Sequence, residues 1–318
     1  MRIEGLDHLR GIGVLLVLFF SVAPWVYVQG GYEFLNHVIK GEFHLGDLVF
    51  PLFLFSSGTS IFLYLALHGK VGFFDGAKKY AKLLFVALFI SALRLFLPFP
   101  DEVMVIAVCD TLIFAVLMVS GKRGLAAYCI AGMALLATMP NFAAGLWEEL
   151  TKPYLGGTIG IIYYSLYAAG GFFAASAALQ NYPKKIDPSA PEAYAKFGIA
   201  ALIVFLVSLM FWEIDRTGLS ITFVFLSLAV YCFALAFLVW LCDNKKIHNG
   251  LISTLGSVSI VGWAVFYATT SAVLLSGESW AFSWSNYLLV LAAMVSVCYV
   301  SIKALIALHI ARGRYNKH

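Results

Sequence analysis

The chain has 318 residues, of which 62% are hydrophobic and only 12% charged, and its mean hydropathy is +0.89. A soluble domain usually carries about 25% charged residues, so this composition excludes a water-soluble fold and indicates a membrane protein. The net charge of +4 does not indicate a nucleic-acid partner, because in a membrane protein the placement of Lys and Arg matters more than their sum.

The apolar residues form runs of roughly 17–25 residues that are nearly free of charge, the length that a helix needs to cross a bilayer. They do not alternate as barrel strands would. The pattern predicts an all-α, polytopic membrane protein with about ten transmembrane helices. The expected spans are Gly11–Val28, Leu48–Leu67, Leu83–Phe99, Val103–Val119, Leu125–Met139, Thr158–Leu179, Phe197–Trp212, Ile221–Cys242, Leu251–Leu275 and Tyr287–Ile310.

Basic residues gather at the termini and in alternate connections, whereas the remaining connections carry mainly Asp and Glu. Because cytoplasmic loops are rich in Lys and Arg, both termini are predicted to be cytoplasmic. The chain is predicted to be one domain, residues 1–318, with halves 1–180 and 195–318 joined by a proline-containing cytoplasmic linker. The first apolar run lacks a small-residue cleavage site and is expected to remain as a membrane helix.

The five cysteines lie within or at the ends of apolar spans, and neither a disulfide framework nor a zinc spacing is present, so no metal site is expected.

The richest motifs lie in the first two helices and their connection. Leu6, Asp7, Arg10 and Gly11 form a Leu-Asp-x-x-Arg-Gly opening, His37 stands ten residues before Asp47, and Asp47–Pro51 reads Asp-Leu-Val-Phe-Pro. A Phe-Leu-Phe at Phe53–Phe55 and a Gly-x-Ser-Ile at Gly58–Ile61 follow. This string resembles the transmembrane acyltransferase family of heparan-alpha-glucosaminide N-acetyltransferase and its bacterial relatives.

The resemblance implies transfer of an acetyl group from cytosolic acetyl-CoA to an amino sugar, glycan or other small acceptor at the outer face. It implies that Arg10, at the cytoplasmic end of the first helix, and Lys79, at that of the third, hold the phosphates of CoA. An ion pair between Arg10 and Asp7, three residues apart on one helical face, is the competing interpretation. The small residues Ser57, Gly58 and Ser60 are expected to line a channel for the pantetheine arm or to serve close helix packing.

Acyl transfer needs a base that removes the proton of the acceptor, or a nucleophile that carries the acyl group, and a neutral imidazole can do either. The family register assigns this role to His37, with Asp47 orienting the ring as carboxylates do in catalytic triads. His44, three residues before Asp47, is the rival. His8 is expected to be a residue at the level of the lipid headgroups.

Asp110 lies about two turns inside the fourth expected span, where an ionised group needs a partner or water. It is therefore predicted to face the interior of the bundle, with Arg94 as its partner, either as a structural ion pair or as part of the cavity wall. Trp263 is among the aromatic residues expected to anchor the protein at the membrane interface or, as the alternative, to offer a surface on which a sugar stacks.

The pattern departs from the family at Lys40, where an aromatic residue is common, and at Cys109–Thr111, where the family usually carries Gln-Arg. The acceptor therefore stays open, as does the choice between direct transfer and an acyl-histidine. A transporter or flippase using Asp110 and Arg94 is the alternative function. The expected location is a bacterial inner membrane, among membrane lipids, and relatives suggest a homodimer.

Overall fold

The computed structural model describes residues 3–22, 26–28, 45–69, 73–92, 102–142, 144–151, 157–214, 219–276, 280–282 and 284–315. Nearly all of these residues are helical. The helices are α1 (Glu4–Val22), η3 (Leu45–Leu48), α2 (Val49–His68), α3 (Phe73–Ser91), α4 (Glu102–Phe142), α5 (Ala144–Thr151), α6 (Gly157–Ala178), α7 (Ala190–Ser208), α8 (Ile221–Leu238), η5 (Val239–Asn244), α9 (Gly250–Ser257), α10 (Ile260–Ser276) and α11 (Trp284–Tyr315). Two short strands, β1 (Val26–Val28) and β2 (Trp280–Phe282), pair in parallel.

Six helical segments of the described residues are long and apolar enough to cross a membrane, and a seventh span results if the bent pair α9 and α10 is counted as one. The segments are Gly46–His68, Glu102–Pro140, Gly157–Ala178, Ala190–Ser208, Ile221–Asn244 and Tyr287–Leu308. The protein is therefore a multi-pass membrane protein, because in lipid a helix satisfies the hydrogen bonds of its own backbone.

The predicted spans agree best with α2, α6 and α8, whose ends lie within a few residues of those expected. The first span was placed too late, since α1 begins at Glu4 and Val26–Val28 form a strand. Helix α7 likewise begins at Ala190, inside the predicted linker. The polar first turns of these helices carry no hydropathy signal, which explains the late starts.

Two predicted spans, Val103–Val119 and Leu125–Met139, lie in the two arms of α4. This helix is interrupted at Gly121, whose φ of 66° and ψ of −164° are not helical. A 39-residue segment would be about 58 Å long if straight, nearly twice the hydrocarbon thickness. The break therefore accounts for the two runs that the sequence pattern separates.

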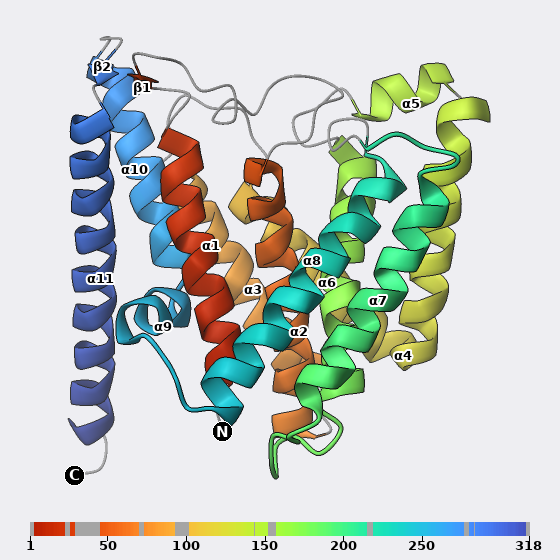
Figure 1. Ribbon diagram of the computed structural model, residues 1–318, viewed down its shortest axis with the longest axis horizontal. Helices are drawn as coiled ribbons and strands as arrows, with labels where there is room; N and C mark the ends of the chain where they lie inside the picture. Colours follow the sequence, from red (N-terminus) through yellow and green to blue (C-terminus); the bar gives the residue numbers. More distant parts are fainter. Residues whose placement is uncertain are drawn as a thin grey trace.

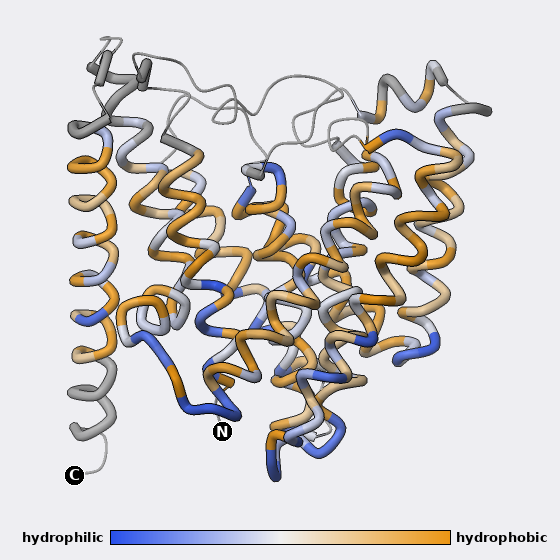
Figure 2. Tube along the Cα trace, in the orientation of Figure 1, coloured by the Kyte–Doolittle hydropathy of each residue, from blue (hydrophilic) through white to orange (hydrophobic). Residues whose placement is uncertain are grey.

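The helices form one bundle in which α1 begins and α11 ends at the same end (Figure 1). That end also holds the turns with Lys122, Arg123, Lys184 and Lys185, and its connections are the most hydrophilic part of the described chain (Figure 2). Of the residues in the apolar window of α6, 78% are buried, against 17% for α11. Helix α6 is thus central, whereas α11 lies at the periphery.

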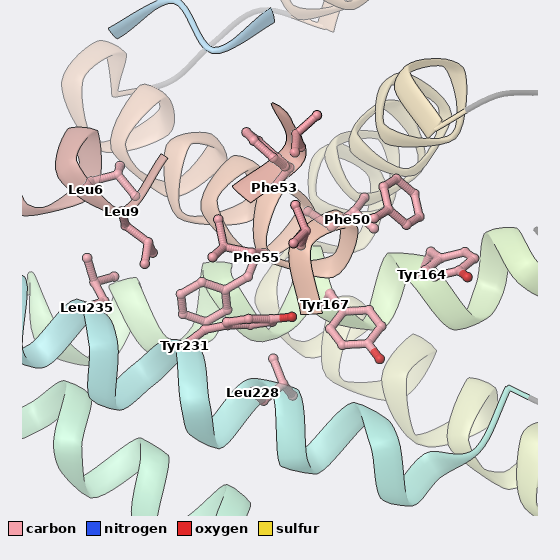
Figure 3. Close-up of a cluster of buried hydrophobic side chains, with 14 of the residues drawn as sticks. Leu6, Leu9, Phe50, Phe53, Phe55, Tyr164, Tyr167, Leu228, Tyr231 and Leu235 are labelled. Carbon is pink, nitrogen blue, oxygen red and sulfur yellow. The ribbon is translucent and has the colours of Figure 1, made fainter. Parts of the chain in front are cut away.

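Large apolar and aromatic side chains fill the centre of the bundle, where Phe55 of α2 meets Tyr231 of α8 with ring centroids 5.6 Å apart (Figure 3). In lipid the hydrophobic effect between helices is weak, so close packing must hold them together. Gly58 of α2 provides such packing, because a Cβ at this position would lie 1.8 Å from the carbonyl oxygen of Ala168 in α6. Helices α2 and α6 therefore cross backbone to backbone.

Candidate active site

A cavity of about 230 Å³ lies among α1, α2, α3, the first arm of α4 and the start of α10. It extends from Phe53 to Ile61 on α2, a rise of about 12 Å along that helix. Four of the predicted CoA-binding residues line it, namely Arg10, Ser57, Ser60 and Lys79. Asp110, predicted to be a cavity residue, lines it as well.

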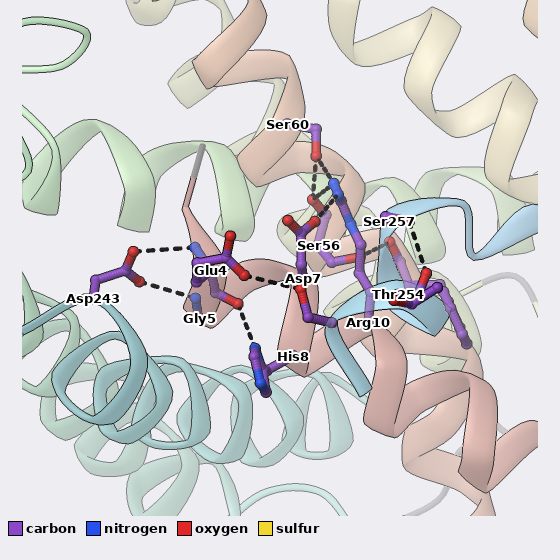
Figure 4. Close-up of polar contacts among 12 residues, drawn as sticks. Glu4, Gly5, Asp7, His8, Arg10, Ser56, Ser60, Asp243, Thr254 and Ser257 are labelled. Atoms are coloured by element: carbon purple, nitrogen blue, oxygen red, sulfur yellow. Dashed lines mark hydrogen bonds and ion pairs between the residues drawn. The ribbon is translucent and has the colours of Figure 1, made fainter. Parts of the chain in front are cut away.

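Arg10 reaches from α1 across to α2. Its guanidinium donates hydrogen bonds to the carbonyl oxygen of Ser56, at 3.2 Å, and to the hydroxyl of Ser60 (Figure 4). Its other terminal nitrogen lies 3.6 Å from a carboxylate oxygen of Asp7. The ion pair with Asp7 therefore exists, but it leaves the guanidinium directed at the hydroxyl-rich segment of α2 that lines the cavity.

Asp110 is 5% exposed and accepts a hydrogen bond of 2.5 Å from the hydroxyl of Ser57. Arg10 and Lys79 line the same cavity. The carboxylate therefore faces the bundle interior, as predicted, and accepts its hydrogen bond from Ser57. Arg94, its predicted partner, lies outside the described residues.

Lys79 reaches the cavity from α3. Its ammonium group lies 3.2 Å from the centre of the Tyr64 ring and 5.7 Å from that of Tyr80. Aromatic faces attract a cation while leaving its hydrogen-bond donors free. The cavity wall thus carries the cations of Arg10 and Lys79 and the carboxylate of Asp110, and Asp7 is paired with Arg10 beside it.

The remainder of the cavity wall is largely apolar and includes Trp263 of α10. This side chain is 5% exposed and its ring packs against Phe53 at 5.5 Å between centroids, so the prediction of an interface anchor is wrong. Its indole nitrogen is buried and has no hydrogen-bond partner among the described residues. A buried donor without an acceptor is costly, and an acceptor atom of a bound molecule would satisfy it.

The cavity also includes Ser259, which stands where the predicted span Leu251–Leu275 is broken. Helices α9 and α10 meet there at a bend of 84°, so the expectation of one continuous helix is wrong. Helix α9 packs tightly on α1, since a Cβ on Gly256 would lie 1.7 Å from the carbonyl oxygen of Asp7. The break places the beginning of α10 beside the first four helices.

Polar contacts hold α9 against the first turns of α1 (Figure 4). The Nδ1 of His8 lies 2.9 Å from the carbonyl oxygen of Glu4, and its Nε2 accepts from the backbone N–H of Asn249 at 2.8 Å. The hydroxyl of Ser253 donates to the carboxylate of Glu4 at 2.9 Å. His8 is 4% exposed and joins α1 to the start of α9, so its ring is buried by protein; its level relative to the lipid headgroups stays a prediction.

The start of α1 is fixed by a residue that the sequence did not single out. Asp243, in η5, accepts hydrogen bonds from the backbone N–H groups of Glu4, at 3.0 Å, and Gly5, at 2.9 Å (Figure 4). A carboxylate at a helix N-terminus satisfies free N–H groups and meets the positive end of the helix dipole. No local pattern could have shown this cap, because the two segments are over 230 residues apart.

The outer part of the predicted site is only partly described. Asp47 lies in η3, directly before α2, and is 5% exposed. His37 and His44 lie outside the described residues. Gly58, predicted to bind the cofactor, does not line the cavity but packs against α6.

The sequence model of the family described as "Heparan-alpha-glucosaminide N-acetyltransferase, catalytic" matches residues 2–167, just over half of the chain. The chain belongs to this family. It is accordingly a membrane acetyltransferase. No curated protein matches the chain.

The matched region contains the helices that supply Arg10, Ser57, Ser60, Lys79 and Asp110. Ser259 and Trp263 lie beyond it, so the second half of the chain completes the cavity that the family region begins. The sequence did not indicate Ser259, nor that Trp263 lies in the cavity wall, because their positions there depend on the bend between α9 and α10.

Proposed function

We propose that this protein transfers an acetyl group from cytosolic acetyl-CoA to an amino sugar, glycan or other small acceptor at the outer face of the membrane. The observation that supports this most is the cavity that unites Arg10, Ser57, Ser60 and Lys79 with Asp110 inside the bundle. The family match adds acetyl transfer as the reaction class.

The residues present suit an acyl-CoA. Arg10 and Lys79 are cations that would hold phosphate oxygens. Ser57 and Ser60 carry hydroxyl groups that can bond to the amides of the pantetheine arm, and the apolar wall suits its methylene groups. Acetyl-CoA supplies an activated thioester carbonyl, and a narrow cavity allows the arm to enter the bundle without movement of the whole donor.

We propose ten crossings, with both termini in the cytoplasm. The two arms of α4 count as two crossings, α9 and α10 as one, and α1 and α3 complete the set. The basic turns lie at the end of the bundle where α1 begins, in agreement with the rule that cytoplasmic loops are positive. The whole chain then forms one catalytic domain, which we place in a bacterial inner membrane as a homodimer surrounded by lipid.

At the outer end, His37 takes the proton of the acceptor amine or hydroxyl group, and Asp47 orients the imidazole. The acceptor atom attacks the thioester carbonyl, the carbon–sulfur bond breaks, and the departing CoA thiolate receives a proton. In the variant of this mechanism with an acyl carrier, His37 itself accepts the acetyl group before the acceptor does. The burial of Asp47 supports an inward-facing role for its carboxylate.

The test is acetyl transfer by purified protein supplied with radiolabelled acetyl-CoA, with and without glucosamine. His37→Ala should lower the rate by roughly 100-fold or more, as loss of a general base does. His68→Ala is the matched control, because His68 is exposed at the end of α2 and away from the cavity. Equal rates for His37→Ala and wild type would remove His37 from the mechanism.

A binding measurement with acetyl-CoA separates this proposal from the transporter alternative. Wild-type protein should bind the donor in calorimetry without any acceptor present. Failure to bind acetyl-CoA would contradict the acyltransferase assignment of the cavity.

A further inference from the structure

A second cavity, of about 340 Å³, lies between α1 and α8 with α2 behind it. Helices α1 and α8 meet near Gly5, where an added Cβ would lie 2.7 Å from the backbone nitrogen of Val239. From that contact they diverge toward the opposite end of the bundle (Figure 1). We call the space between them the α1–α8 groove, lined by Leu9, Ile12, Leu16, Phe20, Leu48, Leu52, Val230, Tyr231, Ala234, Phe237 and Leu238.

The groove is chemically uniform. Tyr231 carries the only polar side-chain group among its lining residues, and this hydroxyl donates to the carbonyl oxygen of Leu48 at 2.5 Å. No lining side chain carries a charge. A ligand here can gain only from apolar contact, so the groove suits a hydrocarbon and not a sugar or a nucleotide.

The groove has a wall and a mouth. Leu9, Phe20 and Leu52 are buried, whereas Val230 and Phe237 of α8 are 39% and 57% exposed. These two residues line the groove and belong to a membrane-spanning helix, so the groove opens toward lipid at this edge. A hydrocarbon chain can therefore enter sideways from the bilayer.

The size of the groove suits one chain. A cavity of roughly 150 Å³ holds a benzene ring, so 340 Å³ accommodates about a dozen carbon atoms. The lining runs from Leu9 to Phe20, about 16 Å along α1. A helix of a second copy would not fit, because an α-helix with its side chains is about 10 Å across.

The groove also points to the proposed reaction site. Its lining reaches Phe20, near the end of α1, and Leu48, which directly follows the buried Asp47. A chain lying in the groove would therefore hold its head group beside Asp47, which the proposed mechanism pairs with His37. We propose that the groove binds the single hydrocarbon tail of a lipid-linked acceptor and presents its sugar head to this outer site. The inference rests on the proposed function and specifies its substrate class.

The experiment compares acetylation of glucosamine with that of its butyl, hexyl and octyl glycosides below their micellar concentrations. In wild-type protein kcat/KM should rise with chain length, and its value for the octyl glycoside should be at least tenfold that for glucosamine. Ala234→Trp fills the groove and should reduce this ratio of the two kcat/KM values to below about threefold, while leaving the rate on glucosamine unchanged. Val230→Trp, at the exposed mouth, repeats the test without burying a large side chain in the core.

Ala200→Trp is the matched control, because Ala200 is exposed on α7, away from the groove. It should keep the wild-type ratio, which excludes simple enrichment of alkyl glycosides in the membrane. A chain-length preference that survives in both groove variants would overturn the proposal, as would its absence from wild-type protein.

Photocrosslinking gives a readout that does not depend on catalysis. A glucosaminide with a diazirine in its alkyl tail should label α1 or α8, and octyl glucosaminide should compete better than octanoic acid. Equal competition would show that the groove takes any bilayer chain and would overturn the acceptor assignment. Specific labelling without any acetyl transfer would sustain the groove site and contradict the proposed reaction instead.

Discussion

The hydroxyl of Ser57 donates a 2.5 Å hydrogen bond to the carboxylate of Asp110, and this contact joins α2 to the first arm of α4 in the wall of the cavity. Both groups lie within membrane-spanning helices, where an ionised side chain is costly unless it is paired or solvated. The cations of Arg10 and Lys79 line the same cavity. The four polar side chains therefore belong to one cavity wall.

Loss of the carboxylate should destabilise the protein more than loss of the hydroxyl group. Asp110→Ala removes the hydrogen bond and one of the two carboxylates beside the cations of Arg10 and Lys79, for a cost of about 3 kcal/mol, whereas Ser57→Ala should cost about 1 kcal/mol. Thermal unfolding in one detergent measures both, and Asp110→Asn should lie between them. Equal effects of Asp110→Ala and Ser57→Ala would show that the charges are not coupled.

Arg10 should contribute to donor affinity beyond its pairing with Asp7. Arg10→Ala should weaken acetyl-CoA binding by about 10-fold to 100-fold in calorimetry. Arg10→Lys should restore only part of it, since an ammonium group cannot reproduce the two directed contacts to Ser56 and Ser60.

Asp7→Asn is the control for this prediction, because it removes the ion pair but keeps the guanidinium. Its donor affinity should stay within about threefold of wild type. A loss as large as that of Arg10→Ala would mean that Arg10 acts mainly as the partner of Asp7.

Gly58 should prove to be a packing residue. Gly58→Ala places a methyl group against the carbonyl oxygen of Ala168, so the helices must separate, at a cost of about 1–3 kcal/mol. Gly145→Ala adds the same methyl group where nothing lies within 4 Å and should be nearly neutral. The protein with Gly58→Ala should unfold at lower temperature yet keep its KM for acetyl-CoA. A raised KM for acetyl-CoA with unchanged stability would instead show that Gly58 contributes to donor binding, as the sequence predicted.

Removal of the carboxylate that caps α1 should weaken the end of the bundle where α1 begins. Asp243→Ala leaves the N–H groups of Glu4 and Gly5 without their acceptor, and the cost should be about 1 kcal/mol. Asp243→Asn retains one acceptor oxygen and should lose less. Faster hydrogen exchange at the first turn of α1 is the direct readout, and unchanged exchange in Asp243→Ala would contradict the capping role.

The sequence by itself determined the class of structure and half of the site. Long apolar runs must become helices in lipid, which is why α2, α6 and α8 could be predicted almost to their ends. The motif of the first two helices indicated the family and the residues Arg10, Ser57 and Ser60, and the depth of Asp110 within an apolar run predicted that it faces the interior. The roles of His37, His44, Asp47 and Arg94 stay predictions.

Only the tertiary structure decided which residues meet. The bend between α9 and α10 brings Ser259 and Trp263 to the cavity, and Asp243 reaches α1 from the far half of the chain. The divergence of α1 and α8 opens a groove whose lining residues look like any other apolar run. Hydropathy reports the solvent around a helix, whereas the contacts between helices depend on side-chain shape and crossing angle, which no single segment encodes.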